Sequence, residues 1–221
     1  MSIRIIDSST APQLPWKNGK GVTLELAIAP TDAGLDDFDW RISSARVERA
    51  GPFSHYPGID RSLGLLSGAG LRLNLPEQIS LELDSQTPVV VFPGELDVQA
   101  ELLDGPVQDF NLMSRRSRWQ HRLQYRELKG QQWLDSSAVL FIYCCSGAGL
   151  TCARADMAPI RLSAEQGLLL EDEAGPWRLT SHGRSGLYLA RLEPVTAEQE
   201  AIDLLSDDWA QPSTLSKSRS V

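Results

Sequence analysis

Ser67-Gly68-Ala69-Gly70-Leu71 recurs unchanged as Ser146-Gly147-Ala148-Gly149-Leu150, and each copy follows an apolar run. Both copies have the composition of a strand, a tight turn and a second strand. At the same offset, residues 88–92 lie opposite residues 167–171, so a second pair of apolar strand candidates keeps the register. Two aligned features at one spacing indicate duplicated units of about 80 residues, a period too long for a solenoid. The chain is therefore predicted to hold two similar β-domains.

Short segments rich in Val, Ile, Leu, Phe and Tyr follow one another along the chain, separated by Gly, Pro, Asp and Ser. This pattern is typical of an all-β sandwich or barrel. The strand candidates are residues 22–29, 40–47, 62–66, 71–75, 79–83, 123–128, 138–144 and 186–192. Helix is expected only from Thr196 onward, where a capping Thr precedes three apolar residues, and that helix is short.

Composition excludes several classes of protein. The chain has 221 residues, enough to close one large core or two small ones. A formal net charge of -8 argues against nucleic acid as a partner, because phosphate binding needs clustered Lys and Arg. No window approaches the roughly 20 apolar residues of a membrane span, and the N-terminus lacks a signal-peptide pattern, so a cytoplasmic location is expected. The three cysteines, two of them adjacent, predict free thiols.

Five blocks in the first half of the chain resemble the HutD/Ves family of bacterial bicupins, in the order expected for that family. They are Trp16-Lys17-Asn18-Gly19-Lys20-Gly21-Val22-Thr23 with Glu25; Phe38-Asp39-Trp40-Arg41-Ile42-Ser43; Gly51-Pro52-Phe53-Ser54 with Pro57-Gly58-Ile59-Asp60-Arg61; Phe92-Pro93-Gly94; and Asp109-Phe110-Asn111-Leu112-Met113. No comparable block occurs in the C-terminal repeat, so there the resemblance covers the fold and not a site.

The resemblance implies an all-β bicupin, two fused cupin barrels with little helix. Residues 1–115 would form the N-terminal barrel with the motifs and the ligand pocket, and residues 116–195 the C-terminal barrel. Residues 196–221 would form a short helix and a polar tail. Cupins often dimerise through sheet edges, so a homodimer is a further expectation. The family is associated with histidine utilisation, where it resembles a regulator or ligand sensor without an established reaction.

The histidines argue against a metal cofactor. A metal-dependent cupin needs about three imidazoles and a carboxylate around one ion. His55, His121 and His182 are isolated in the sequence, and no two are close enough to share a strand face. We therefore expect no metal and no other cofactor, with His55 of interest because it lies in the motif loop of residues 51–61.

Three cations of the motif blocks predict an anion site. Lys17, Arg41 and Arg61 lie among aromatic, Gly and Pro neighbours, which favours inward-pointing side chains. An Arg fork takes a carboxylate in two parallel hydrogen bonds, and a Lys adds a point charge. The competing interpretation is pairing with Asp39, Asp60 or Glu25, and at least one such pair is expected because buried charges need partners. The candidate ligand-binding residues are Arg61, Lys17, Arg41, His55, Glu25, Trp16 and Phe53, with Arg61 foremost.

The resulting functional hypothesis is a metal-free bicupin that binds a small carboxylate metabolite as a sensor or regulator of histidine utilisation. N-formylglutamate, or a related acid of that pathway, is the candidate ligand implied by the resemblance. One alternative is a metal-independent isomerase or epimerase in which Glu25, Asp60 or His55 acts as the base. A second alternative is a protein-interaction module.

Overall fold

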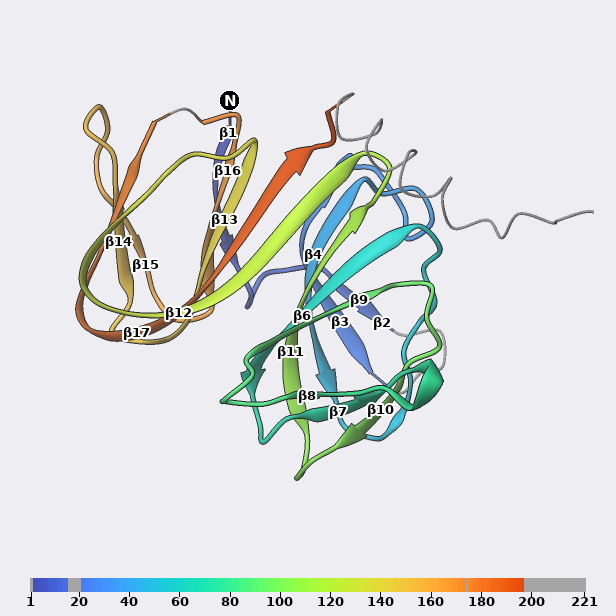
Figure 1. The fold of residues 1–221 in the computed structure, drawn as a ribbon. Coiled ribbons are helices and arrows are strands. Elements are labelled where there is room, and N and C mark those ends of the chain that lie inside the picture. Colours follow the sequence, from blue (N-terminus) through green and yellow to red (C-terminus); the bar gives the residue numbers. More distant parts are fainter. Residues whose placement is uncertain (1, 16–20, 174, 197–221) are drawn as a thin grey trace, which may run out of the picture.

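The computed structural model describes residues 2–15, 21–173 and 175–196, and the chain there is almost entirely β (Figure 1). The strands are β1 (Ser2–Asp7), β2 (Gln13–Pro15), β3 (Val22–Ala29), β4 (Trp40–Val47), β5 (Gly51–Pro52), β6 (Ile59–Ser67), β7 (Leu71–Asn74), β8 (Ser80–Leu83), β9 (Val89–Pro93), β10 (Gln99–Leu102), β11 (Val107–Arg115), β12 (Trp119–Leu134), β13 (Val139–Gly147), β14 (Leu150–Ala153), β15 (Ile160–Leu162), β16 (Gln166–Glu171) and β17 (Trp177–Pro194). The only helical element of the described part is a 3-10 turn, η1 (Pro76–Gln78). The helix expected after Thr196 lies outside the described residues.

The two halves of the chain have matching topologies. In the first half the strands lie in the order β4-β11-β6-β9, and in the second half in the order β12-β17-β13-β16. In each half, the hairpin that follows the repeated pentapeptide (β7-β8 or β14-β15) extends the barrel. The duplication predicted from the pentapeptide is therefore confirmed in the strand order of the two halves.

The repeated glycines explain why the pentapeptide is the same in both halves. Gly68 and Gly70 have φ of +97° and +134°, and Gly147 and Gly149 have φ of +91° and +84°, a region that favours glycine. A Cβ on Gly70 would lie 2.2 Å from a carbonyl oxygen of β8, and one on Gly149 would lie 2.7 Å from the equivalent oxygen of β15. Both turns therefore exclude a side chain for the same two reasons, backbone conformation and close backbone approach.

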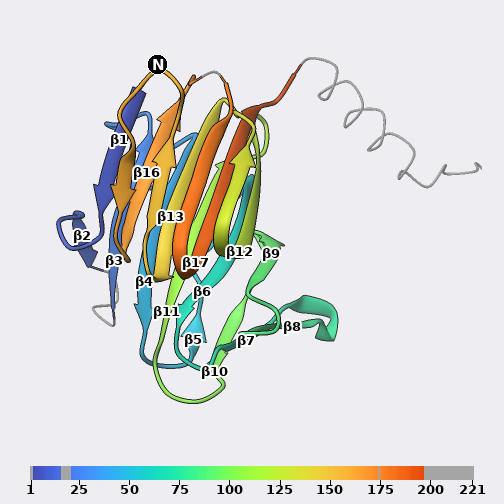
Figure 2. The same ribbon diagram turned by 90° about the vertical axis from the view of Figure 1, so that its left-hand side faces the viewer.

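The first strand of the chain belongs to the sheet of the second half. Residues 2–7 were expected in the N-terminal barrel, but β1 pairs antiparallel with β16 over all six of its residues and so joins the sheet of the second half. Figure 2 shows β1, β16, β13, β17 and β12 side by side in front of the strands of the first half. An edge strand is stabilised wherever its backbone finds a partner, which the local sequence does not specify.

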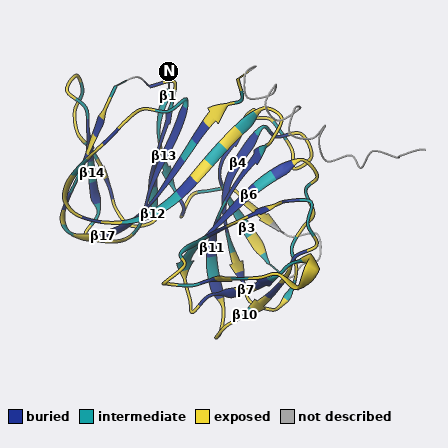
Figure 3. Ribbon diagram, in the orientation of Figure 1, coloured by how far each residue is buried: buried dark blue, intermediate teal, exposed yellow. Residues whose placement is uncertain are grey.

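A large buried cluster lies between the two barrels and contains side chains from both halves. Figure 3 shows buried segments along β4 and β13, on the two sides of this interface. Phe110 of the first half stacks on Tyr188 of the second, with ring centroids 5.3 Å apart and planes inclined by 5°. The Tyr188 hydroxyl donates to the carbonyl oxygens of Leu65 at 2.7 Å and Pro88 at 3.0 Å. The two barrels thus share one core and are not independent domains joined by a linker.

Each barrel also encloses a core of its own, built from apolar residues on the inward face of its strands.

Among the described residues, no helix is long and apolar enough to span a membrane.

Candidate functional site

A cavity of about 310 Å³ opens inside the N-terminal barrel. It is lined by residues of β2, β3, β4, β6 and β11 and of the segments 35–36 and 52–56. Strand alternation explains which side chains reach it: on β4, Arg41 and Ser43 face the cavity, whereas Trp40 and Ile42 face the other barrel. Its volume falls at the small end of the range of known ligand pockets.

Arg61 of β6 is the most unusual side chain in the cavity wall. It is only 5% exposed, and its guanidinium carbon lies 5.2 Å from the ring centroid of Phe53, 5.2 Å from that of Phe92 and 5.7 Å from that of Tyr56. One Nη donates to the Ser54 carbonyl oxygen at 3.2 Å, while Nε has no hydrogen-bond partner. Burial lowers the pKa of Arg61 to about 10, so the side chain is still charged at neutral pH.

Arg41 of β4 lies in the same wall but is already paired. Its Nε donates to the Glu25 carboxylate at 2.8 Å, and one Nη contacts the Ser43 hydroxyl at 3.5 Å. The ion pair expected between a motif cation and a nearby acid is therefore confirmed for Arg41. Among the described residues, Arg61 makes no ion pair. Arg61 therefore still lacks a charged partner, whereas Arg41 already has one in Glu25.

Two polar residues of β11 complete the wall. Asp109 is buried, and one of its carboxylate oxygens accepts a hydrogen bond from the Ala45 backbone N–H at 3.0 Å. Burial raises the pKa of Asp109 to about 7, although the Ala45 hydrogen bond and the charge of Arg61 oppose the shift. Asn111, two residues further along the strand, has a buried side-chain oxygen without a partner.

The candidate residues named from the sequence fall into three groups. Arg61, Arg41, His55 and Phe53 line the cavity. Glu25 stands beside it as the partner of Arg41. Trp16 and Lys17 lie outside the described residues.

Sequence reasoning missed Asp109 and Asn111 as site residues, although both belong to a quoted motif block. The signal was available: polar Asp109 and Asn111 alternate with apolar Phe110 and Leu112, so the two polar side chains share one strand face. What the alternation does not reveal is which face borders a cavity.

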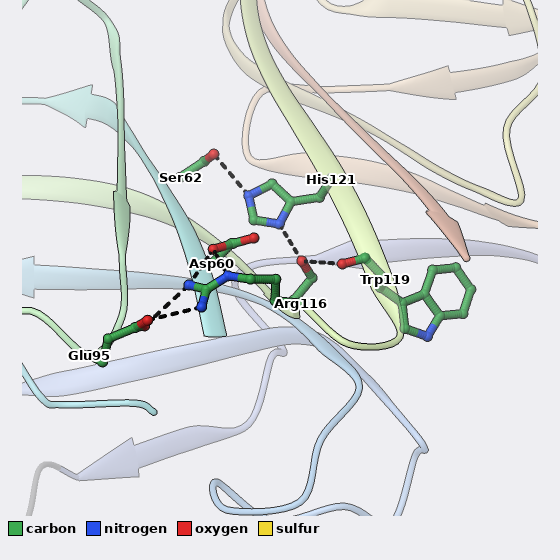
Figure 4. A network of polar contacts seen from close by, with 7 residues as sticks. Asp60, Ser62, Glu95, Arg116, Trp119 and His121 are labelled. Atoms are coloured by element: carbon green, nitrogen blue, oxygen red, sulfur yellow. Dashed lines mark hydrogen bonds and ion pairs between the residues drawn. The ribbon is translucent and has the colours of Figure 1, made fainter. Parts of the chain in front are cut away.

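A second polar cluster lies on the opposite face of β6 and β11, between the barrels (Figure 4). His121 of β12 bonds the Ser62 hydroxyl at 2.9 Å through Nε2 and the Ser114 hydroxyl at 2.7 Å through Nδ1. Burial lowers the pKa of His121 to about 4, so the ring is neutral at physiological pH. Beside it, Arg116 bridges the carboxylates of Asp60 and Glu95. All these groups are engaged with one another, which indicates a structural role.

Metal ligands do not gather in the described part of the chain: no group of three or more His, Cys, Asp or Glu residues there could hold an ion. The three cysteines are free thiols, and burial raises the pKa of each.

A family model, a curated relative and a solved structure all match this chain over most of its length. The family model described as HutD matches residues 8–189. An uncharacterised 21.2 kDa protein in the hutC 3' region of Pseudomonas putida is 36% identical over 138 residues, which cover 62% of this chain and 72% of that protein. A conserved protein of unknown function from Pseudomonas aeruginosa PAO1 has a similar crystal structure, with a TM-score of 0.80 and 32% identity over 87% of this chain and 100% of that one.

Two further solved structures share the fold. HutD from Pseudomonas fluorescens SBW25, in a formate condition, has a TM-score of 0.74 and 26% identity over 88% of this chain and 100% of that one. A formate complex of oxalate decarboxylase from Lactobacillus farciminis has a TM-score of 0.61 at 8% identity, over 94% of this chain and 93% of that one. The latter likeness concerns the fold alone, which is the two-barrel cupin fold predicted from the sequence.

Proposed function

This chain belongs to the HutD family of cupin proteins associated with histidine utilisation, and on that premise we propose that it binds a small carboxylate metabolite in the cavity of its N-terminal barrel. The observation that carries the proposal is Arg61, a buried guanidinium at the cavity wall with an unpartnered Nε and no ion pair among the described residues. Buried charges in proteins are ordinarily paired, because an uncompensated charge in an apolar setting costs several kcal/mol. A ligand carboxylate would supply the missing partner.

The surroundings of Arg61 suit such a ligand. Three aromatic rings lie around the guanidinium, and the Arg61 side chain is largely shielded from solvent, so the anion meets a fork that is already packed in place. The ion pair with Glu25 neutralises Arg41, which leaves Arg61, among the described cations of the cavity wall, available to the ligand. In this proposal the protein is a sensor or regulator of histidine utilisation, with N-formylglutamate as the candidate ligand.

Calorimetric titration tests the proposal. Wild-type protein, Arg61→Ala and Arg61→Lys are titrated with formate, acetate, glutarate and N-formylglutamate. Loss of a charge-assisted hydrogen-bond pair should weaken binding at least about tenfold in Arg61→Ala, and lysine should recover it only in part because a point charge cannot replace the fork. Arg72→Ala is the matched control, since Arg72 is exposed and pairs with Glu82 on β8.

The outcome is decisive if the variants fold. A folded Arg61→Ala protein that binds every acid as tightly as the wild type would overturn the proposal. A change of similar size in Arg72→Ala would show that the loss is a nonspecific charge effect and would equally count against the Arg61 site.

One observation favours a second candidate function, a metal-independent isomerase or epimerase. Asp109 is a cavity carboxyl whose pKa is raised by burial to about 7, a value suited to taking up and returning a proton at neutral pH. Of the bases named from the sequence, Glu25 and Asp60 are held by Arg41 and Arg116. Incubation of a bound acid in deuterated water, followed by NMR, would detect exchange of a carbon-bound proton. Exchange that is abolished in Asp109→Asn while binding persists would support the enzyme.

A further inference from the structure

The polar groups that the cavity wall presents differ from one end of β11 to the other. Met113, Asn111 and Asp109 all face the cavity, and the backbone register places Met113 directly between Arg41 of β4 and Arg61 of β6. Asp109 lies four residues further along the strand, about 13 Å away at about 3.3 Å per residue. One end of this wall therefore offers hydrogen-bond donors and positive charge, and the other end offers the Asp109 carboxyl and the unpartnered side-chain oxygen of Asn111.

The acceptor end is incompletely satisfied. The side-chain oxygen of Asn111 is buried without a partner. The Asp109 carboxyl receives the Ala45 backbone N–H as its one side-chain hydrogen bond among the described residues, and no cation there lies within ion-pair distance of it. Burial accordingly raises the pKa of its carboxyl. A buried carboxyl with so little compensation is costly to the fold, so a partner supplied from outside the chain would be stabilising.

We propose that the ligand is an acid that also carries a hydrogen-bond donor, such as an amide N–H or an ammonium group, several bonds from its carboxylate, and that Asp109 selects it by accepting from that donor. This inference rests on the proposed function, in which Arg61 takes the carboxylate. A plain dicarboxylate would bring a second anion toward Asp109 and Asn111 and leave both acceptors without a donor. A site built around such acceptors discriminates strongly against an analogue that lacks the donor, because the site's own polar groups stay unpaired.

Matched pairs of probes isolate the donor. Acetamido acids with two to five methylene groups between the amide nitrogen and the carboxylate are each compared with the acetoxy acid, in which oxygen replaces N–H. Calorimetry should show the best amide binding at least about tenfold more tightly than its ester in the wild type. In Asp109→Asn the amide oxygen keeps the bond from Ala45 N–H and turns an NH₂ donor toward the ligand, so the preference should fall to within about twofold or reverse. Asp84→Asn is the matched control, because Asp84 accepts from backbone N–H groups in an exposed turn outside the cavity lining.

The outcomes separate this inference from the proposed function. Amide and ester that bind equally well, with both weakened in Arg61→Ala, would overturn the inference and leave carboxylate binding intact. Absence of any Arg61-dependent binding of simple or acetamido acids would overturn the proposed function and the inference with it. If Asp109→Asn fails to fold, the comparison of amide with ester in the wild type decides alone, since equal affinities there already contradict a role for Asp109.

Discussion

Replacing Asp109 by asparagine is expected to stabilise the ligand-free protein above neutral pH. Burial raises the pKa of the Asp109 carboxyl from its ordinary value of 3.8 to about 7. Between those two pH values the folded state holds a proton that the unfolded chain has released, so the folded state binds more protons and wild-type stability falls as pH rises through this window. Asparagine has no such proton and carries no such penalty.

The magnitude follows from the two pKa values. At about 1.4 kcal/mol per pH unit, the difference between 3.8 and about 7 corresponds to a penalty of up to about 4 kcal/mol once the pH exceeds 7. Below about pH 4 the carboxyl is protonated in both states and the penalty vanishes. The free energy of unfolding of Asp109→Asn minus that of the wild type should therefore rise by up to about 4 kcal/mol from pH 4 to pH 8.

Urea unfolding followed by tryptophan fluorescence, at pH 4.5, 6, 7 and 8, measures this difference. Taking the difference cancels the titration of all other groups, which both proteins share, and acid-free buffers avoid stabilisation by a bound carboxylate. Asp84→Asn is the matched control, because Asp84 accepts hydrogen bonds from backbone N–H groups in a turn outside the cavity lining. A difference that stays constant within about 0.5 kcal/mol from pH 5 to pH 8 would refute the account of Asp109 as an uncompensated buried acid.

Three further outcomes are expected. Gly64→Ala should destabilise the protein by about 1–3 kcal/mol in urea unfolding, because a Cβ at this position would lie 2.7 Å from the Tyr188 ring. Gly51→Ala is the control and should be near neutral, because a Cβ there would meet no atom within 4 Å. Equal effects of the two substitutions would contradict this packing. Relative to His121→Gln, the wild type should lose up to about 3 kcal/mol of unfolding free energy as pH falls from 6.5 to 4. The reason is that burial lowers the folded-state pKa of His121 to about 4, so in this pH range only the unfolded chain gains the proton. Unfolding free energies of the two proteins that stay parallel across this range would contradict the prediction. Burial raises the pKa of the Cys152 thiol to about 12, so in the native protein this thiol should react with a maleimide far more slowly at pH 7.5 than in urea-unfolded protein. Mass spectrometry of the labelled peptide measures the two rates, and comparable rates would mean that the thiol is accessible.

Much of the fold was predictable because it follows from local pattern. The predicted strands at residues 22–29 and 40–47 coincide with β3 and β4, since both segments contain alternating apolar residues, Gly21 and Pro30 flank the first, and Asp39 precedes the second. The predicted strands at residues 123–128 and 186–192 fall inside β12 and β17, which run to 16 and 18 residues. The extra length comes from pairing with each other across a bulge, a long-range interaction.

By itself, the sequence determined the duplication, many of the strands and the burial of Arg61, because each leaves a trace within a few residues: identical turns, period-two alternation, and a cation among aromatic and Gly neighbours. The strands β1, β10, β11 and β15 were not among those predicted. Only the tertiary structure decided that β1 pairs with β16, that Tyr188 packs against Gly64, and that Arg61 and Asp109 share one cavity. These depend on strand order and register between residues 48 to 169 positions apart in the sequence. A strand's side-chain pattern shows which residues share a face, but the neighbours that this face meets are fixed only when the sheets close.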